Sequence, residues 1–140
     1  MHSDDERRRT EADCARLCVD FAHHLDARRY PQVLALFTPD GVLDRMGAVH
    51  AGHAEIARFL DARSTEVTTR HLCTNIRVDV KSPDLATGSC YVLFFQGRHD
   101  DGKEAVQASA PMVVEYHDRY SRTPEGWRIR ERRIVIAMRP

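Results

Sequence analysis

The sequence predicts an α+β domain in which helices come first and a sheet follows. Between Thr10 and Leu25, apolar residues recur at helical spacing and form one stripe: Cys14, Leu17, Cys18, Phe21 and Leu25. From Glu66 onward the period of the pattern changes to that of strands. There is no internal repeat and no linker-like tract, so helices and strands are expected to pack into one domain spanning residues 1–140.

Three helices are predicted in the N-terminal half. The first should stop near residues 28–30, because the residue before Pro31 is disfavoured in a helix. Pro31 suits a first helical position and opens a short second helix through Phe37. The third helix starts after Gly52 and carries the stripe Ile56, Phe59 and Leu60.

A short strand is predicted between the second and third helices. Residues 38–41, Thr-Pro-Asp-Gly, have the composition of a turn. Val42, Leu43 and Asp44 follow as a brief strand, before a second turn.

Four long strands are predicted after the helices, over residues 67–80, 86–97, 104–120 and 127–138. Residues typical of turns occupy each join, at 81–84, 99–102 and 122–126. An antiparallel meander is the simplest topology for strands joined in this way.

Composition excludes some classes of protein. The chain has 140 residues, of which 42% are hydrophobic and 30% charged, the profile of a globular domain. Lys+Arg and Asp+Glu both number 21, which argues against nucleic-acid binding by bulk charge. No apolar run approaches the roughly 20 residues that span a bilayer. The acidic, polar start predicts no secretion signal, so a cytoplasmic protein is expected, with residues 1–9 a flexible or solvated extension.

Neither a metal nor a cofactor is predicted. The four cysteines are too scattered for a disulfide framework or a zinc site and are interpreted as small buried side chains. His50 and His53 flank one glycine-broken turn, a weak metal signal that is outweighed by ordinary surface or pocket-mouth histidines. The sequence contains no phosphate-cradling loop.

Asp44 is an unusual residue for the end of an apolar strand. A carboxylate at the inner end of a buried strand must be paired, hydrated or shifted in pKa. Such a group is a candidate for acid–base chemistry. The alternative is that Asp44 caps a local turn or pairs with an arginine such as Arg45.

The pattern helix–turn–Asp40-Gly41-Val42-Leu43-Asp44, followed by Gly47, Gly52 and a helix, resembles the nuclear transport factor 2-like superfamily. The SnoaL-like cyclase, scytalone dehydratase and ketosteroid isomerase branches belong to it, and residues 70–75 and 126–130 strengthen the resemblance, which spans about residues 10–138. It implies a cone-shaped, bent antiparallel or mixed sheet wrapped around three helices, with an internal pocket. Asp44 matches the general base of the isomerase branch.

His71 and Asp26 are the other candidate catalytic residues. His71 shares strand parity with Val67, Cys73 and Asn75, the face assigned to the pocket. In the scytalone dehydratase branch, a histidine on the matching strand is the acid–base group and an acid in the first helix orients it. Asp26 matches that acid, although an acid at this place could instead close the helix or hold an arginine.

Aromatic and apolar residues are expected to line the pocket and bind the substrate: Phe21, Tyr91, Tyr116, Met112 and Phe59. Phe21 stands where the isomerase branch has a tyrosine, so no intact oxyanion hole is predicted. Tyr91 and Tyr116 could instead pack in the core with their hydroxyls satisfied.

The last strand combines a predicted core residue with a basic stretch. Trp127 is expected in the core. A solvated edge is expected for the basic residues that follow, which pair with acids such as Glu131 or Glu115: Arg128, Arg130, Arg132 and Arg133.

Apolar residues on both faces of two predicted strands indicate that a second copy of the chain covers the sheet. The strand of residues 91–95 is apolar on both faces, and the strand of residues 67–80 carries apolar residues on both parities. A sheet covered by helices needs only one apolar face, so a homodimer through the sheet is expected. The alternative is a bulge that switches parity within one chain.

The residues and the resemblance together imply a cofactor-independent acid/base enzyme, a lyase or isomerase that acts as dehydratase, isomerase or cyclase. Its substrate would be a small, largely apolar cyclic or polyketide-like molecule. The alternative is a binding or assembly module without catalysis, like the small subunit of ring-hydroxylating dioxygenases.

Overall fold

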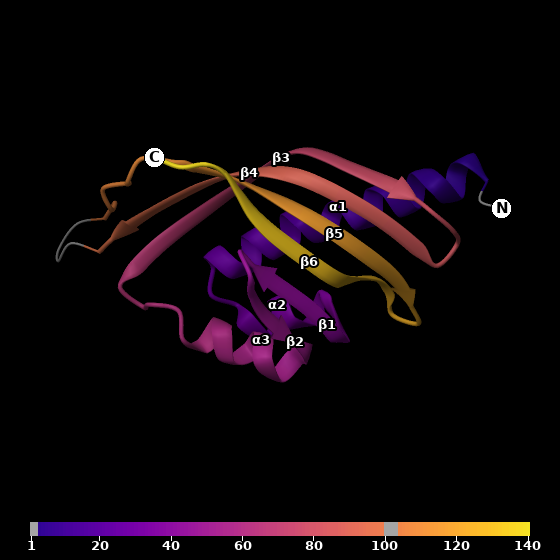
Figure 1. The fold of residues 1–140 in the computed structure, drawn as a ribbon, viewed down its shortest axis with the longest axis horizontal. Coiled ribbons are helices and arrows are strands. Elements are labelled where there is room, and N and C mark those ends of the chain that lie inside the picture. The colour runs from indigo at the N-terminus through magenta and orange to yellow at the C-terminus, as the bar shows by residue number, and fades with distance from the viewer. Residues whose placement is uncertain (1–2, 100–103) are drawn as a thin grey trace.

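The computed structural model describes residues 3–99 and 104–140 and shows helices followed by a sheet (Figure 1). The helices are α1 (Asp4–Asp26), α2 (Tyr30–Ala35) and α3 (Gly52–Asp61). The strands are β1 (Phe37–Arg45), β2 (Ala48–Ala51), β3 (Val67–Val80), β4 (Leu85–Arg98), β5 (Met112–Thr123) and β6 (Gly126–Met138). The predicted α+β class is confirmed.

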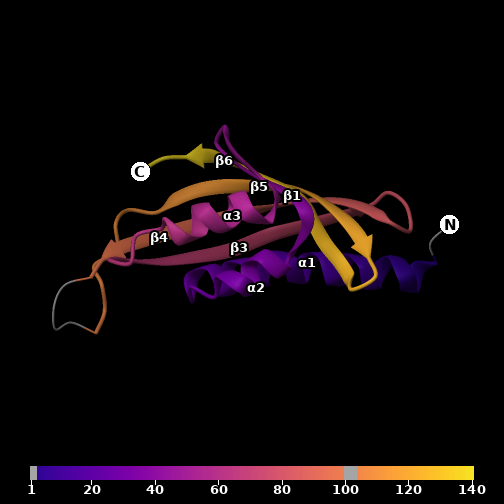
Figure 2. The same ribbon diagram turned by 90° about the horizontal axis from the view of Figure 1, so that it is seen from below.

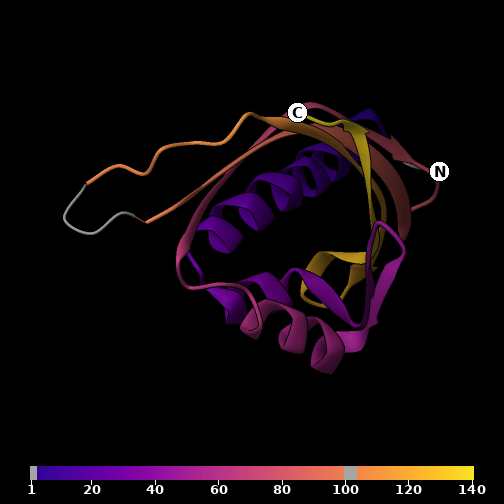
Figure 3. The same cartoon turned by 60° about the vertical axis from the view of Figure 1, so that its left-hand side comes forward.

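One six-stranded mixed sheet forms the body of the protein, in the order β2-β1-β6-β5-β4-β3. Strands β3 to β6 form the predicted antiparallel meander, whereas β1 joins β6 in parallel. The sheet is strongly curved but not closed, and α1 lies along its concave side (Figure 3). Helices α2 and α3 lie across the open side of the curve (Figures 2 and 3).

Helix α1 forms where its stripe predicts. Ser3 and Glu6 make a capping box at its start, with each side chain bonded to the other's backbone N–H. The predicted stripe from Cys14 to Leu25 is buried. Residues 4–9 belong to this helix with exposed side chains, while residues 1–2 of the expected extension lie outside the described residues.

Strand β1 begins earlier than predicted. The second helix ends at Ala35, and Phe37 is already the first residue of β1. Residues 38–41, expected as a turn, lie within β1, at an irregularity in its pairing with β6 between Phe37 and Val42. Gly41 fits here because a Cβ at this position would come within 2.9 Å of the Thr38 carbonyl oxygen. Strand β2, which the sequence did not predict, pairs with β1.

Strand β5 begins later than predicted, at Met112 instead of Glu104. Residues 106–111 have no regular structure, although the Ser109 N–H donates to the Gln96 carbonyl at 2.8 Å. The turn predicted at residues 99–102 lies, apart from His99, outside the described residues.

A bulge changes the face of β3 midway. Asn75 has a φ of 52°, and the pairing with β4 shifts between Thr74 and Arg77. Ile76 and Val78 therefore pack against the core, as does Cys73, although they have the opposite parity. This is the predicted alternative to a covered second face. Leu72 and Tyr91 still expose 51% and 48% of their surface, and the homodimer remains a prediction.

The core contains a fully buried ion pair. Trp127 and Ile129 are buried as expected, but Arg132 is buried as well, which corrects its predicted place on a solvated edge. The pairing of β5 with β6 shifts between Arg119 and Tyr120, and this irregularity turns Arg132 inward. Its Nε and Nη2 each donate to Asp118 at 2.8 Å.

The structure also bears on membrane spanning and on the four cysteines. Of the helices in the described ranges, none has the length and apolar character needed to cross a bilayer. The cysteines are free, with three buried and Cys73 half-buried.

Candidate active site

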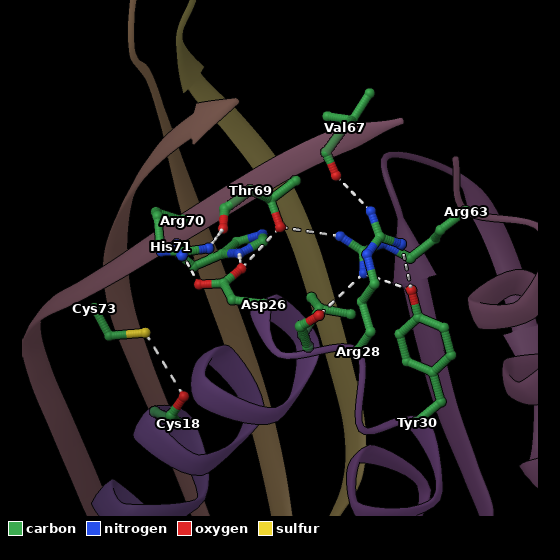
Figure 4. Close-up of polar contacts among 11 residues, drawn as sticks. Cys18, Asp26, Arg28, Tyr30, Arg63, Val67, Thr69, Arg70, His71 and Cys73 are labelled. Carbon is green, nitrogen blue, oxygen red and sulfur yellow. Dashed lines mark hydrogen bonds and ion pairs between the residues drawn. The ribbon is translucent and has the colours of Figure 1, made fainter. Parts of the chain in front are cut away.

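Asp26 and His71, which the family resemblance predicts to be an acid that orients a histidine, lie in contact (Figure 4). Asp26 is the last residue of α1, and His71 lies on β3, against which α1 packs. The His71 Nδ1 and the Asp26 Oδ1 are 2.6 Å apart. The His71 side chain is 10% exposed and that of Asp26 12%, so the pair is shielded but still open to water.

The Asp26 carboxylate is held by three hydrogen bonds. The Thr69 hydroxyl donates to Oδ1 at 2.9 Å, and the His71 N–H donates to Oδ2 at 2.9 Å. The third is the bond from the imidazole. Burial raises the pKa of Asp26, but the hydrogen bonds and charge of His71, with the bond from Thr69, outweigh it and hold this pKa below its ordinary value.

This geometry fixes the tautomer of His71. An ionised carboxylate can only accept, so the proton of the shared bond is on Nδ1. In the neutral form of the ring Nε2 carries the free lone pair, and Nε2 has no hydrogen-bond partner among residues 3–99 and 104–140. The ring lies 4.8 Å from the Phe94 ring, centroid to centroid. An imidazole oriented in this way is suited to accept and return a proton.

A pocket of about 330 Å³ lies beside the pair. Thr69, which bonds Asp26, and Phe94, which packs on His71, belong to its wall. The other lining residues come from the loops after α1 and α3, from α3 itself, and from β1, β3 and β4: Arg28, Arg45, Phe59, Ala62, Arg63, Ser64, Val67 and Gln96. The pocket is therefore part apolar and part basic.

Two arginines tie the elements of this wall together. Arg63 donates to the Leu25 carbonyl at 3.1 Å, the Tyr30 hydroxyl at 3.0 Å and the Thr69 hydroxyl at 3.2 Å. The Thr69 hydroxyl in turn donates to Asp26, so Arg63 is linked to the pair through one side chain.

Arg28 makes the second tie. It donates to the Val67 carbonyl and, at 3.2 Å, to the Tyr30 hydroxyl (Figure 4). It also donates to the Ser64 carbonyl at 2.7 Å. Its φ of 59° lies in the left-handed region, just past the end of α1, where glycine is usual. The three bonds of its guanidinium hold this residue in a conformation that costs free energy.

Asp44 does not reach this pocket, which corrects the expectation that it points inward. Leu43 is the buried residue of this strand end, and strand alternation turns Asp44 to the other face. Its Oδ1 accepts from the Gly47 N–H at 2.9 Å in the turn between β1 and β2. Asp44 caps a turn, as the alternative interpretation has it.

Of the five residues expected to bind substrate, Phe59 lies in the pocket wall. Phe21 and Tyr116 are in the core, edge to face with ring centroids 5.8 Å apart. Met112 packs against that core, and Tyr91 is exposed on the convex face, because β4 buries the residues of even number. None of these four lines the pocket beside His71.

His50 and His53 have structural contacts. The His50 ring stacks on Phe59 with centroids 5.0 Å apart, and the His53 Nε2 lies 3.1 Å from the Phe37 carbonyl oxygen. In the part of the chain that the structure describes, no three His, Cys, Asp or Glu side chains gather as metal ligands would.

Sequence reasoning missed most of the pocket wall. Thr69 has the same strand parity as His71 two residues away, so strand alternation was a usable signal for it. Arg45 was considered as a possible partner of Asp44, but it was not predicted to line the pocket. Arg28 and Arg63 gave no signal, because their positions depend on how the loops after α1 and α3 pack.

Some known proteins resemble this chain in sequence and others in structure. The uncharacterized protein Rv2910c of Mycobacterium tuberculosis is 29% identical over 116 residues, 81% of this chain and 76% of that protein. A candidate scytalone dehydratase from Novosphingobium aromaticivorans has a TM-score of 0.83 at 19% identity, over 97% of this chain and 89% of that one. A hexachlorocyclohexane dehydrochlorinase (LinA, type 2) has a TM-score of 0.82 at 20% identity, over 96% and 90%.

At these identities the two structures show a common fold and nothing finer. The sequence itself goes further, because a profile of the SnoaL-like domain matches residues 6–133. The chain therefore belongs to the SnoaL-like family, within the nuclear transport factor 2-like superfamily.

Proposed function

We propose that this protein is a cofactor-independent acid/base enzyme, a lyase or isomerase, in which His71 moves the proton and Asp26 positions it. The supporting observation is the 2.6 Å contact between His71 Nδ1 and Asp26 Oδ1, which leaves Nε2 without a partner among the described residues. Two of the structural relatives, a candidate scytalone dehydratase and LinA, carry names of elimination enzymes. The substrate would be a small cyclic molecule with a carbonyl group.

The reaction needs one group that first accepts a proton as a base and then donates it as an acid. Nε2 takes a proton from the carbon next to the carbonyl, and the electron pair of the C–H bond forms an enolate. Asp26 stabilises the imidazolium that results, because its carboxylate faces Nδ1–H. The imidazolium then returns the proton to a leaving hydroxyl, which departs as water, or to a different carbon, which gives the isomer.

Proton exchange at carbon tests this proposal. Wild type and variants are incubated with cyclic ketones and β-hydroxy ketones in deuterated buffer and followed by NMR. Wild type should introduce deuterium next to the carbonyl, and His71→Asn should slow this exchange by about 100- to 10,000-fold. Asp26→Asn should also slow it, since an amide does not stabilise the imidazolium.

The chain offers a matched control. His117 also contacts an acid, with its Nε2 3.1 Å from the Glu115 Oε1, but this pair lies on the convex face of the sheet, away from the pocket. His117→Asn should therefore leave exchange unchanged. Equal exchange in wild type and His71→Asn would remove His71 from the mechanism.

A further inference from the structure

The pocket beside His71 has an unusual balance of charge. Three arginines line it, Arg28, Arg45 and Arg63, and no Asp or Glu belongs to its wall. None of the three forms an ion pair with an acid of the described chain. Like charges gathered in a partly desolvated cleft repel one another, so an anion bound there would be stabilised.

Arg45 differs from the other two arginines. The guanidinium groups of Arg28 and Arg63 each donate three hydrogen bonds to backbone carbonyls and hydroxyls. Arg45 makes no hydrogen bond with a described residue, and its Cζ lies 4.0 Å above the centre of the Phe59 ring. Burial, and after it the charge of Arg63, lower the pKa of Arg45, as expected for a cation without a counterion.

The surroundings of Arg45 define what would fit. A guanidinium offers parallel N–H donors that match the two oxygens of a carboxylate. Phe59 and Phe94 both line the pocket and supply apolar surface, and Phe94 contacts the His71 ring. A ligand with an aromatic or cyclic body and one carboxylate would satisfy both the charge and the apolar surface.

We propose that Arg45 binds the carboxylate of the ligand, with Arg63 adding to the positive field, while the ring of the ligand packs against the apolar part of the wall, to which Phe59 and Phe94 belong. The site thus takes small cyclic carboxylic acids in preference to neutral molecules. That this ligand is also the substrate of His71 rests on the function proposed above, but the anion site itself does not.

Paired probes of the same shape test the anion site. Benzoate and 2-naphthoate are compared with benzamide and 2-naphthamide by isothermal titration calorimetry, at about pH 8, where an ordinary imidazole is neutral. Wild type should prefer each carboxylate over its amide by about tenfold to a hundredfold. Arg45→Gln should abolish the preference, and Arg45→Lys should keep part of it.

Arg58→Gln is the matched control, because Arg58 is an exposed residue of the same helix as Phe59 and lies outside the pocket. It removes one positive charge and should keep the preference. Equal binding of carboxylate and amide by wild type, no binding of either carboxylate at millimolar concentration, or a preference unchanged in Arg45→Gln would each overturn the anion site.

His71→Asn separates this inference from the proposed function. A carboxylate preference that survives in His71→Asn shows that the imidazole does not provide it, and the Arg45 variants then assign it to Arg45. If that preference stands while wild type shows no proton exchange, the anion site holds and the proposed catalysis fails. If proton exchange depends on His71 but wild type does not prefer the carboxylates, the proposed catalysis holds and the anion site fails.

Discussion

Two pairs of an acid and a base lie on the concave side of the sheet, and they differ in how far their side chains are exposed to water and to a ligand. Asp118 and Arg132 have side chains that are 0% exposed, and the Tyr120 hydroxyl donates a further hydrogen bond of 2.6 Å to Asp118. Asp26 and His71 keep about a tenth of their surface exposed. The first pair is closed to any ligand, whereas the second keeps a ring nitrogen free beside a pocket.

The closed pair has the surroundings of a structural element. The Arg132 guanidinium lies over the rings of Phe21 and Tyr116, at 4.5 and 4.3 Å. Burial alone would lower the pKa of Arg132, but the charge and hydrogen bonds of Asp118 hold it above the ordinary value. The fully buried pair thus fixes its charges in place, whereas the pair that is still partly exposed to water is the one where a proton can move.

The largest effect is expected from breaking the closed pair. Asp118→Leu leaves the Arg132 charge buried without a partner and should cost about 3–5 kcal/mol of unfolding free energy. The double variant Asp118→Leu/Arg132→Met removes both charges and should recover most of that loss. Urea unfolding measures both, and a double variant no more stable than Asp118→Leu would contradict this account.

The open pair should show itself in the pH dependence of stability. The pKa of Asp26 is lower in the folded state than its unfolded value of about 3.9, so on acidification the unfolded state takes up the proton first. Asp26 therefore stabilises the fold above that pH, and its contribution is lost as the pH falls through the folded-state pKa. At neutral pH, Asp26→Asn should cost about 1–3 kcal/mol, because bonds to a charged acceptor are weakened.

Unfolding in urea at pH 5 and at pH 3 checks the sign. Wild type should lose more stability than Asp26→Asn over this interval, so that the two proteins converge in acid. A difference between them that stays constant from pH 5 to pH 3 would show that the charge of Asp26 does not stabilise the fold.

A smaller effect on stability is expected from substitutions of Arg28, which lines the pocket beside Asp26 and His71. Arg28→Ala and Arg28→Gly both remove the guanidinium bonds, but only alanine keeps the cost of a φ of 59°. Arg28→Gly should therefore be about 1 kcal/mol more stable than Arg28→Ala in thermal or urea unfolding. Equal stabilities would show that residue 28 relaxes once its side chain is lost.

The smallest effect is expected at Asp44. Asn keeps the carbonyl oxygen that accepts from the Gly47 N–H, so Asp44→Asn should change stability by less than about 0.5 kcal/mol. Proton exchange should be unchanged, in contrast to His71→Asn. A large loss of exchange in Asp44→Asn would place the base at the β1–β2 turn instead of at the open pair.

Strand periodicity predicted this site only as far as the strands are regular. The first half of β3 alternates regularly, so the face of His71 followed from its spacing to Cys73. Asp44 was assigned to the wrong face because the parallel pairing of β1 with β6 was not visible in the sequence, and one residue of register reverses a side chain. Arg132 was missed for the same reason, since the irregularity between β5 and β6 precedes it.

The two pairs also differ in how far the chain must travel to form them. Asp118 and Arg132 are 14 residues apart on one hairpin, so they can meet when β5 and β6 close. Asp26 and His71 are 45 residues apart and meet only when α1 docks on β3. Contacts that are distant in sequence close larger loops and form more slowly. The β5–β6 hairpin with its ion pair should therefore form before the contact between Asp26 and His71. A folding intermediate would then contain the hairpin, but its His71 would not yet be oriented by Asp26.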